Sequence, residues 1–236
     1  MKINGEKCIG CGNCMIICPV QAISFNEENK AEINRELCVE CYVCHRDADC
    51  PVKAIRSERL KWPRVIRNPF SSVVATHKLT GIPGRGTEEM KTNDVTNRFK
   101  VGEIGISIEI GRPGLGTRLG NVELFTVPLC KLGVEFEERS PVTAIIDNEN
   151  SLIKKELKDE RVLSAIIEFK IPHEMLGKII ELIRKVEKNI DTVFTVGIIS
   201  RILNNDVNSI LELLSQHNLE AAPNAKINLG LGRKTF

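Results

Sequence analysis

The stretch that decides the fold is CIGCGNCMIICP, from Cys8 to Pro19, and a second version of it, CVECYVCHRDADCP, runs from Cys38 to Pro51. The first spaces its cysteines as C-x2-C-x2-C-x3-C and the second as C-x2-C-x2-C-x5-C, each followed by proline. The residues after the prolines also match, since PVQAI follows Cys18 and PVKAI follows Cys50. The N-terminal part is therefore an internal duplication of about thirty residues, and neither copy can bury a core alone.

The distribution of cysteines and the lack of long apolar runs indicate the cellular location of the protein and the role of its cysteines. Eight of the nine cysteines lie within the first 50 residues, and only Cys130 lies outside them. No run approaches the roughly eighteen apolar residues of a membrane span, and residues 1–10 lack the apolar core of a signal peptide. Clustered cysteines in such a chain more often bind metal than form disulfides. We therefore expect a cytoplasmic protein with metal-binding cysteines.

Two kinds of metal site could use eight thiolates. A structural zinc site takes four ligands, usually as two C-x2-C pairs with a long spacer between them. Three cysteines at i, i+3 and i+6 instead wrap one compact turn around an iron–sulfur cluster. In two-cluster ferredoxins, the fourth cysteine, which precedes a proline, binds the other cluster. The spacing favours iron–sulfur clusters, with zinc or free thiols as the alternatives.

Residues 1–57 resemble the bacterial-type ferredoxin with two [4Fe–4S] clusters. The resemblance implies that one cluster is bound by Cys8, Cys11, Cys14 and Cys50, and the other by Cys18, Cys38, Cys41 and Cys44. It also implies one-electron transfer by a module typical of anaerobes. The sequence departs from the family pattern in the x5 spacing before Cys50, which we expect to lengthen a loop beside the second set.

Residues 58–100 are interpreted as a basic linker followed by a polar loop that binds a ligand or a partner. Residues 53–67 hold six basic side chains against one acid, Glu58. This strip is either a solvated linker or a surface that docks against acidic groups, including those of the cysteine module. The stretch 76–98 has no regular apolar period, which favours a functional loop. Its candidate binding residues are His77, Arg85, Glu88, Glu89, Lys91, Asn93, Asp94 and Arg98.

A glycine-rich pattern, G-x-P-G-x-G-T, occurs at Gly81–Thr87 and again at Gly111–Thr117. Each threonine could cap a following helical turn, and the glycines would let backbone amides converge on a phosphate or carboxylate. Arg112 and Arg118 flank the second loop and are further candidates for an anionic ligand. We expect the two loops and Arg98 to form one pocket for an anionic ligand near a cluster. The alternative is two glycine–proline turns that are alike only in composition.

Residues 101–236 are predicted to form an α+β domain. Strands are expected at 103–110, 133–138, 142–146, 162–171, 191–201 and 225–231, and helices at 117–132 (with a kink at Pro128 or a division there into two short helices), 175–186 and 206–217. Their β-α-β, β-α-β order predicts a sandwich of ferredoxin-like topology. The stretch 162–199 also resembles the second half of an ACT-type small-molecule domain, which implies ligand sensing or pairing of two copies through sheet edges.

The stretch 76–98 is similar to a segment of the 6-hydroxynicotinate reductase family, whose members are anaerobic, ferredoxin-linked reductases. The chain has no flavin or nucleotide fingerprint. The leading hypothesis is therefore the electron-delivering component of an anaerobic reductase, possessing two [4Fe–4S] clusters. A redox- or metabolite-sensing regulator and a ferredoxin-fused helper of sulfur assimilation are the alternatives.

The expected partners follow from these hypotheses and from the charge balance. A redox partner protein comes first, and an anionic small molecule and a second copy of the chain are further candidates. Lys and Arg number 33 against 31 Asp and Glu, so the net charge of +2 gives no reason to expect nucleic acid. The absence of long apolar runs likewise argues against a membrane partner.

Overall fold

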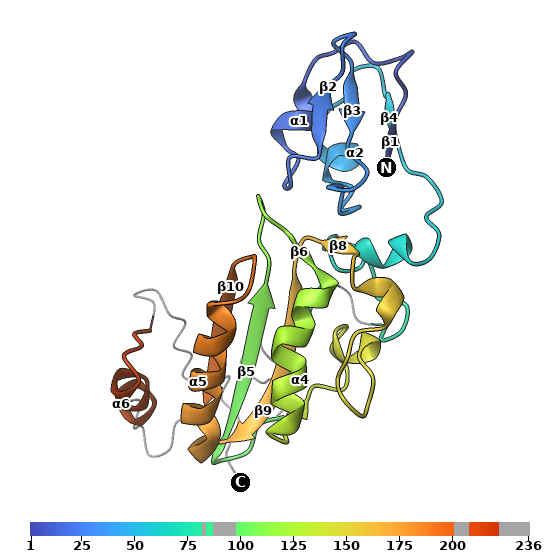
Figure 1. The fold of residues 1–236 in the computed structure, drawn as a ribbon. Coiled ribbons are helices and arrows are strands. Elements are labelled where there is room, and N and C mark those ends of the chain that lie inside the picture. Colours follow the sequence, from blue (N-terminus) through green and yellow to red (C-terminus); the bar gives the residue numbers. More distant parts are fainter. Residues whose placement is uncertain (82–83, 87–97, 201–207, 222–236) are drawn as a thin grey trace.

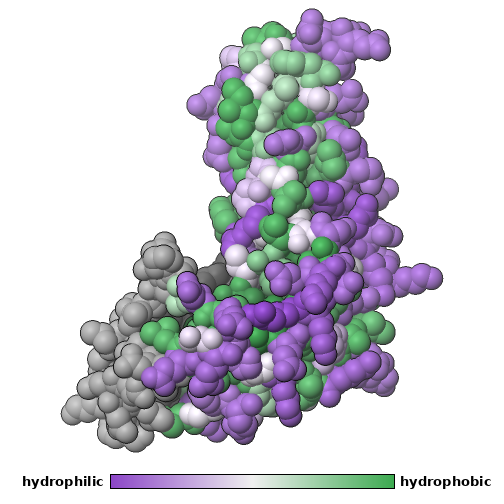
Figure 2. Space-filling model, turned by 60° about the vertical axis from the view of Figure 1, so that its left-hand side comes forward, coloured by the Kyte–Doolittle hydropathy of each residue, from purple (hydrophilic) through white to green (hydrophobic). Residues whose placement is uncertain are grey.

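The computed structural model describes residues 1–81, 84–86, 98–200 and 208–221 of the 236-residue chain. Residues 1–57 form a small module, blue in Figure 1, that stands at one end of a larger region of helices and strands. In Figure 2 the module rises as a narrow projection above the wider lower part, with hydrophobic and hydrophilic residues interspersed on the visible face. Within the described residues, no helix is long and apolar enough to cross a membrane.

The module is built from paired short elements, as its duplicated sequence suggests. It contains β1 (Lys2–Ile3), α1 (Asn13–Ile16), β2 (Ile23–Phe25), β3 (Ala31–Ile33), α2 (Val43–Asp47) and β4 (Ile55–Arg56). Strands β2 and β3 form an antiparallel hairpin, and β1 pairs with β4, which ties the beginning of the module to its end. Each helix begins after a residue in the left-handed conformation, Gly12 in the first copy and Tyr42 in the second. The chain therefore turns sharply inside each cysteine run.

The larger region contains a four-stranded antiparallel sheet in the order β10-β5-β9-β7. Its strands are β5 (Glu103–Ile110), β7 (Glu135–Phe136), β9 (Ala165–Pro172) and β10 (Phe194–Ser200), and its helices are α4 (Glu123–Lys131), α5 (Leu176–Glu187) and α6 (Asn208–Gln216). A small ladder joins β6 (Thr117–Arg118) to β8 (Arg161–Val162). Short 3-10 helices lie at 64–67, 119–122, 143–145, 155–157 and 173–175. Helix α4 connects β5 to β7, and α5 connects β9 to β10. In both cases another strand of the sheet lies between the two that the helix connects.

Alternation along β5 decides which face of the sheet is buried. The four isoleucines of this strand, at every second position from Ile104 to Ile110, have no exposed surface. Because alternate residues of a strand point to opposite faces, all four lie on the side that α4 and α5 cover (Figure 1). The residues between them and before them are Glu103, Gly105, Ser107 and Glu109, so β5 presents mainly polar residues to the other face of the sheet, called the polar face below.

Two residues of the predicted linker and ligand loop at 58–100, Gly86 and Phe99, lie against this polar face. Phe99 is buried, at 3% exposed, and its ring occupies the space where a Cβ atom at Gly105 would stand. A Cβ atom at Gly86 would lie 2.9 Å from the Cδ1 atom of Ile166 and 3.2 Å from a carboxylate oxygen of Glu168. The glycines thus allow the chain to lie close to the sheet at these two positions.

Most of the predicted strands and helices are present. The bounds of β5 match the prediction, α5, α6 and β10 lie within predicted ranges or one residue beyond them, and the predicted strand 162–171 is divided between β8 and β9. The predicted strand 133–138 is reduced to the two residues of β7. The final predicted strand, 225–231, lies outside the described residues.

Two predictions for the α+β region are wrong. The stretch 142–146 is a 3-10 helix rather than a strand, because Val142 and Ile145 are both buried and lie one turn apart. The predicted helix 117–132 begins instead with strand β6, and Thr117, which was expected to cap a helical turn, pairs with Val162. No break occurs at Pro128 either, since α4 continues through it.

Candidate metal centres

The first cysteine-lined cavity has a volume of about 330 Å³ and lies at the end of the module where Cys11 is exposed. It is lined by the four cysteines Cys8, Cys11, Cys14 and Cys50, together with Ile3, Ile9, Gly12, Asn13, Ala31, Val52, Ala54 and Ile55. None of these lining residues carries a charged side chain. The cavity is therefore a mainly apolar space with four sulfur atoms around it.

The second cavity has a volume of about 320 Å³ and is lined by the other four cysteines of the module. These are Cys18, Cys38, Cys41 and Cys44, and the rest of the lining is Met1, Pro19, Val20, Ala22, Ile23, Ile33, Val39 and Tyr42. The cysteine sets of the two cavities are those that the resemblance implied for the two clusters.

Each cavity takes three cysteines from one copy of the repeat and the fourth from the other copy. In the first copy, Cys14 lies in α1 and Cys18 follows the end of that helix. Cys14 and Cys18 are thus at successive points of the same short segment but line different cavities. Of the two extra residues in the second copy, one lengthens α2, which has five residues where α1 has four, and the other lies between α2 and Cys50.

Backbone amides point at three of the cysteine sulfur atoms. The N–H groups of Ala22 and Ala54 donate to the Sγ atoms of Cys18 and Cys50, with N···S distances of 3.2 and 3.3 Å. These two bonds occupy matching positions in the repeat. The N–H of Ala31 donates to Cys8 Sγ at 3.3 Å. Hydrogen bonds to sulfur stabilise the negatively charged thiolate and raise the potential of a cluster that it binds.

Burial disfavours the thiolate form of several cysteines in the metal-free protein. It raises the pKa of Cys14, Cys38 and Cys41, and it raises the pKa of Cys44 to about 12. Metal binding therefore has to displace protons from these thiols. The donor set fits a cluster of several atoms: four cysteines, an apolar lining and amide donors surround each cavity, as iron–sulfur sites require.

The second cavity faces the α+β region. Leu163, which lies between β8 and β9, packs in one buried cluster with Val20, Val39 and Cys41 of the module. The N–H of Gly114 donates to the carbonyl of Pro19, the residue that follows Cys18. Residues of the α+β region thus pack against residues that line the second cavity, although they lie more than 90 positions away in the sequence.

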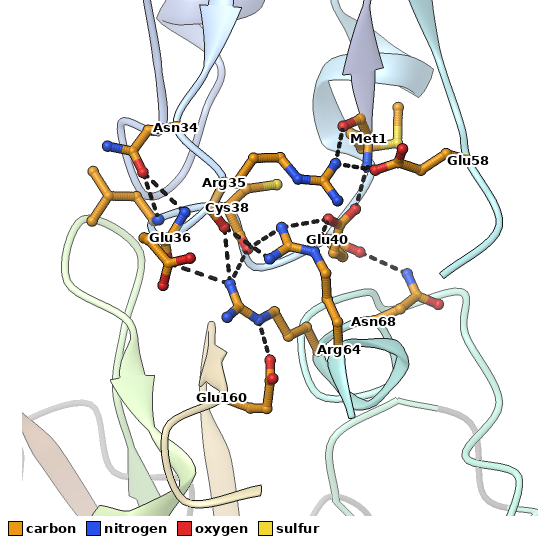
Figure 3. A network of polar contacts seen from close by, with 12 residues as sticks. Met1, Asn34, Arg35, Glu36, Cys38, Glu40, Glu58, Arg64, Asn68 and Glu160 are labelled. Carbon is orange, nitrogen blue, oxygen red and sulfur yellow. Dashed lines mark hydrogen bonds and ion pairs between the residues drawn. The ribbon is translucent and has the colours of Figure 1, made fainter. Parts of the chain in front are cut away.

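Part of the basic strip also contacts the module beside the second cavity (Figure 3). The Nε and Nη2 atoms of Arg64 donate to one carboxylate oxygen of Glu40, at 2.9 and 2.7 Å. Glu40 has no exposed surface, and it also pairs with the Met1 ammonium group. Arg67 is buried, at 4% exposed, and donates to the carbonyl of Cys38 at 2.9 Å. Docking of this strip on the module was one of the two interpretations of its sequence.

Two arginines of the glycine loops meet at one carboxylate on the polar face of the sheet. Arg85 Nη1 lies 3.3 Å from Glu109 Oε1, and Arg112 Nη1 lies 2.9 Å from Glu109 Oε2. The hydroxyl of Ser164 donates to the same carboxylate at 3.2 Å, and Arg112 donates to Thr195 Oγ1 at 2.6 Å. The two glycine loops are therefore neighbours, as expected.

Arg98 and Arg118 do not join this group, which corrects the expectation of a single pocket. Arg98 pairs with Glu135 at 3.4 Å and with Glu137. In the sheet register Glu135 lies level with Gly105, and Gly105 is four residues, about 13 Å, from Glu109 along β5. Arg118 is 54% exposed and lies 3.8 Å from the carboxylate of Asp159 at the surface.

Of the other predicted loop residues, His77 is buried, and the rest lie outside the described residues. His77 is 1% exposed, packs edge-on against Phe70 with ring centroids 5.5 Å apart, and has an unpartnered Nε2 atom. Burial lowers the pKa of His77, which therefore favours its neutral form. Glu88, Glu89, Lys91, Asn93 and Asp94 lie outside the described residues.

Sequence reasoning missed three residues that position the second cavity, Glu40, Glu160 and Leu163. Glu40 had a usable signal, because it is an acid between two predicted metal ligands and the nearby strip supplies arginines three residues apart. Glu160 and Leu163 had none. Glu160 pairs with Arg67, 93 positions away, and Leu163 packs against module residues more than 120 positions away.

Comparison with known proteins agrees with this geometry. Residues 1–57 match a family model described as a 4Fe-4S dicluster domain. Pyruvate synthase subunit PorD of Methanocaldococcus jannaschii is 39% identical over 57 residues, which are 24% of this chain and 64% of that protein. The PorD subunit of Methanothermobacter marburgensis is 39% identical over 59 residues, 25% of this chain and 65% of that protein. The chain thus spans slightly less than two thirds of either relative.

A third relative is matched over nearly its whole length. Ferredoxin Fdx2 of Sorangium cellulosum is 31% identical over 99 residues, which are 40% of this chain and 93% of that protein. No solved structure matches the chain. The eight N-terminal cysteines of the dicluster domain bind two [4Fe–4S] clusters, which make residues 1–57 an electron-transfer module. Through these residues, the chain belongs to the ferredoxins that have a 4Fe-4S dicluster domain.

Proposed function

We propose that this chain is the electron-delivering component of an anaerobic oxidoreductase, with one cluster bound by Cys8, Cys11, Cys14 and Cys50 and the other by Cys18, Cys38, Cys41 and Cys44. The observation that supports the ligand sets is the pair of separate cavities, each lined by four cysteines. When bound, the two clusters supply one-electron transfer with little rearrangement of the surrounding atoms. The similarity to two PorD subunits supports a partner that is itself an oxidoreductase subunit.

In this proposal, partner proteins approach the first cavity. Its rim includes exposed Cys11 and Ile9, and Ile9 is 63% exposed. Ile16 at the end of α1 is 85% exposed. Exposed isoleucines beside a redox centre offer an apolar surface that a partner can cover. The second cavity is instead covered by the chain's own α+β region.

We also propose three units for the chain: the dicluster module at 1–57, a linker and ligand loop at 58–100, and an α+β sandwich at 101–236. The β10-β5-β9-β7 order and the β-α-β-β-α-β succession support the ferredoxin-like topology of the third unit. Its likeness to ACT domains, and the similarity of residues 76–98 to the 6-hydroxynicotinate reductase family, support a role in binding a ligand or a partner close to the module.

Iron analysis of purified variants tests the ligand assignment. Anaerobically purified protein should contain about eight irons per chain, and Cys14→Ala and Cys44→Ala should each lose one cluster. A matched substitution at the cysteine outside the module, Cys130→Ala, should leave the iron content unchanged. Full iron content in Cys14→Ala or Cys44→Ala would overturn the assignment. Purification from the native organism would then show whether a flavin- or metal-containing oxidoreductase partner is present in stoichiometric amount.

A second candidate function is recognition of an anionic metabolite, which the group formed by Arg85, Glu109 and Arg112 favours. Two guanidinium groups share a single carboxylate there, which leaves one positive charge for a ligand. Calorimetry with acetate and succinate should show binding to the unmodified protein and weaker binding to Arg85→Ala and Arg112→Ala. Equal affinity in the variants would exclude this site.

A further inference from the structure

The two cavities lie in unlike electrostatic surroundings. Neither cavity has a charged side chain in its lining. Beside the second, however, buried Arg67 and half-buried Arg64 contact the backbone carbonyl of Cys38, in the loop that also holds Cys41. In a low-dielectric interior such charges act strongly because water screens them little. The difference between the cavities is therefore a difference in the local field.

Arg67 is the most enclosed of these charges. Its Nη1 atom donates to the carbonyls of Arg35, Glu36 and Cys38, at 3.2, 3.2 and 2.9 Å. Its Nε atom pairs with Glu160 of the α+β region. One guanidinium thus connects the cysteine loop of the module to the segment just before β8. Because arginine stays protonated at all physiological pH values, this charge is permanent.

Arg64 has a different role, because its charge is opposed within the module. It pairs with Glu40, which lies between Cys38 and Cys41, and its Nη1 atom donates to the Arg35 carbonyl at 2.9 Å (Figure 3). The charges of Arg64 and Glu40 offset one another close to the loop. The counter-charge of Arg67, by contrast, belongs to Glu160 in the α+β region, so this pair joins the two parts of the molecule.

We propose that Arg67 is a positioning residue that seats the second cysteine loop against the α+β region and raises the reduction potential of the second site. The inference rests on the proposed ligand sets. A permanent positive charge with hydrogen bonds to the backbone of the Cys38 loop stabilises an added electron there. Among the described residues, arginines donate hydrogen bonds to the backbone of residues that line the second cavity and to none that line the first. Arg67 thereby biases an electron towards the covered end of the module, next to the α+β region.

The test is a set of charge changes with opposite expected signs. In Arg67→Gln the midpoint potential of the second site should shift downward, because the positive charge is lost. In Glu160→Gln it should shift upward, because Arg67 then has no counter-charge. The double variant should lie between the two single variants, and Arg67→Lys, which keeps the charge, should shift less than Arg67→Gln. Lys178→Gln is the matched control: Lys178 is exposed on α5, which follows the end of β9, whereas Leu163, which contacts the module, precedes the beginning of that strand.

The potentials would be measured on the full chain by an anaerobic redox titration followed by electron paramagnetic resonance. Hyperfine-shifted NMR signals of the cysteine β-protons would identify the site that shifts. Shifts of the same sign in Arg67→Gln and Glu160→Gln, or no shift in protein with full iron content, would overturn the role of Arg67. If Arg67→Gln fails to keep its iron, Glu160→Gln becomes the test: an upward shift of the second-site potential supports the role of Arg67, and no upward shift overturns it. Failure of the unmodified chain to bind about eight irons would overturn the proposed function instead.

Discussion

Between the first two cysteines of the module, the chain turns at Gly10, which has a φ of +71°. The same position lies against the hairpin turn between β2 and β3, because a Cβ atom there would overlap the carbonyl oxygen of Asn29. Two independent constraints, the left-handed backbone and the close approach, thus allow only glycine at this position. Gly5 is free of both constraints, with no positive φ and no atom within 4 Å of its Cβ position.

We expect Gly10→Ala to destabilise the module by about 1–3 kcal/mol, because an alanine there is strained and displaces the hairpin. The cost should be visible as a lower thermal unfolding temperature and as faster loss of iron from the first site. Gly5→Ala should leave both quantities unchanged. Equal behaviour of the two variants would show that the loop relaxes around the added methyl group.

The buried imidazole of His77 predicts a pH dependence of stability. Burial lowers the pKa of His77 below its usual value of 6.5, so the folded protein keeps the ring neutral while the unfolded chain binds a proton below that pH. The free energy of unfolding should therefore fall between pH 7.5 and pH 5.5, and the fall should be about 1 kcal/mol larger in the unmodified chain than in His77→Phe. Chemical denaturation at both pH values measures the difference. An identical pH dependence would mean that His77 is charged in the folded state.

At the scale of elements, β5 and its edge neighbour β10 illustrate how burial sets the contribution of a side chain to the free energy of unfolding. Ile108 of β5 is fully buried, whereas its partner across the ladder, Val196 of β10, is 40% exposed. We expect Ile108→Ala to cost about 2–5 kcal/mol of unfolding free energy and Val196→Ala to cost less than about 1 kcal/mol. Denaturant unfolding would compare the two. A similar cost for both would mean that β10 is covered in solution.

Prediction from sequence succeeded for elements whose apolar residues follow a regular period along the chain. The isoleucines of β5 alternate, and those of α5 follow a helical period, so both elements lie where predicted. The stretch 142–146 was misassigned because five apolar or small residues in a row fit a strand as well as a turn of helix. The four cysteines around each cavity are those that the resemblance to two-cluster ferredoxins implied; the spacing alone groups only the first three cysteines of each copy, because the fourth comes from the other copy.

The covered position of the second cavity could not be predicted in this way. Arg67 and Glu160 are 93 residues apart, and neither has a neighbouring pattern that points to the other. Leu163 likewise resembles an ordinary strand residue until it is seen against Val20 and Val39. Pairings of single side chains across a tertiary contact leave no period in the sequence, so only the folded chain reveals them.

At the scale of the whole molecule, the contact made by Leu163 predicts how firmly the module is held. Leu163→Asp places a charge in the apolar cluster beside Cys41, which should release the module from the α+β region because an unpaired buried charge is costly. Limited proteolysis should then cut the chain near residues 57–63 several-fold faster. Leu152→Asp, at a position 39% exposed, is the control and should be cut at the unmodified rate. Equal rates would mean that the polar contacts alone hold the module.

The exchange of one cysteine between the two copies of the repeat has a consequence for the protein during its synthesis. Cys50 is needed to complete the first cavity, and Cys18 to complete the second. A nascent chain that has exposed only its first copy outside the ribosome therefore presents three of four sulfur atoms and no finished site. Maturation has to wait for the second copy: the second site has its four cysteines once Cys44 has left the exit tunnel, and the first site, although its first cysteine is made earliest, is completed last, by Cys50.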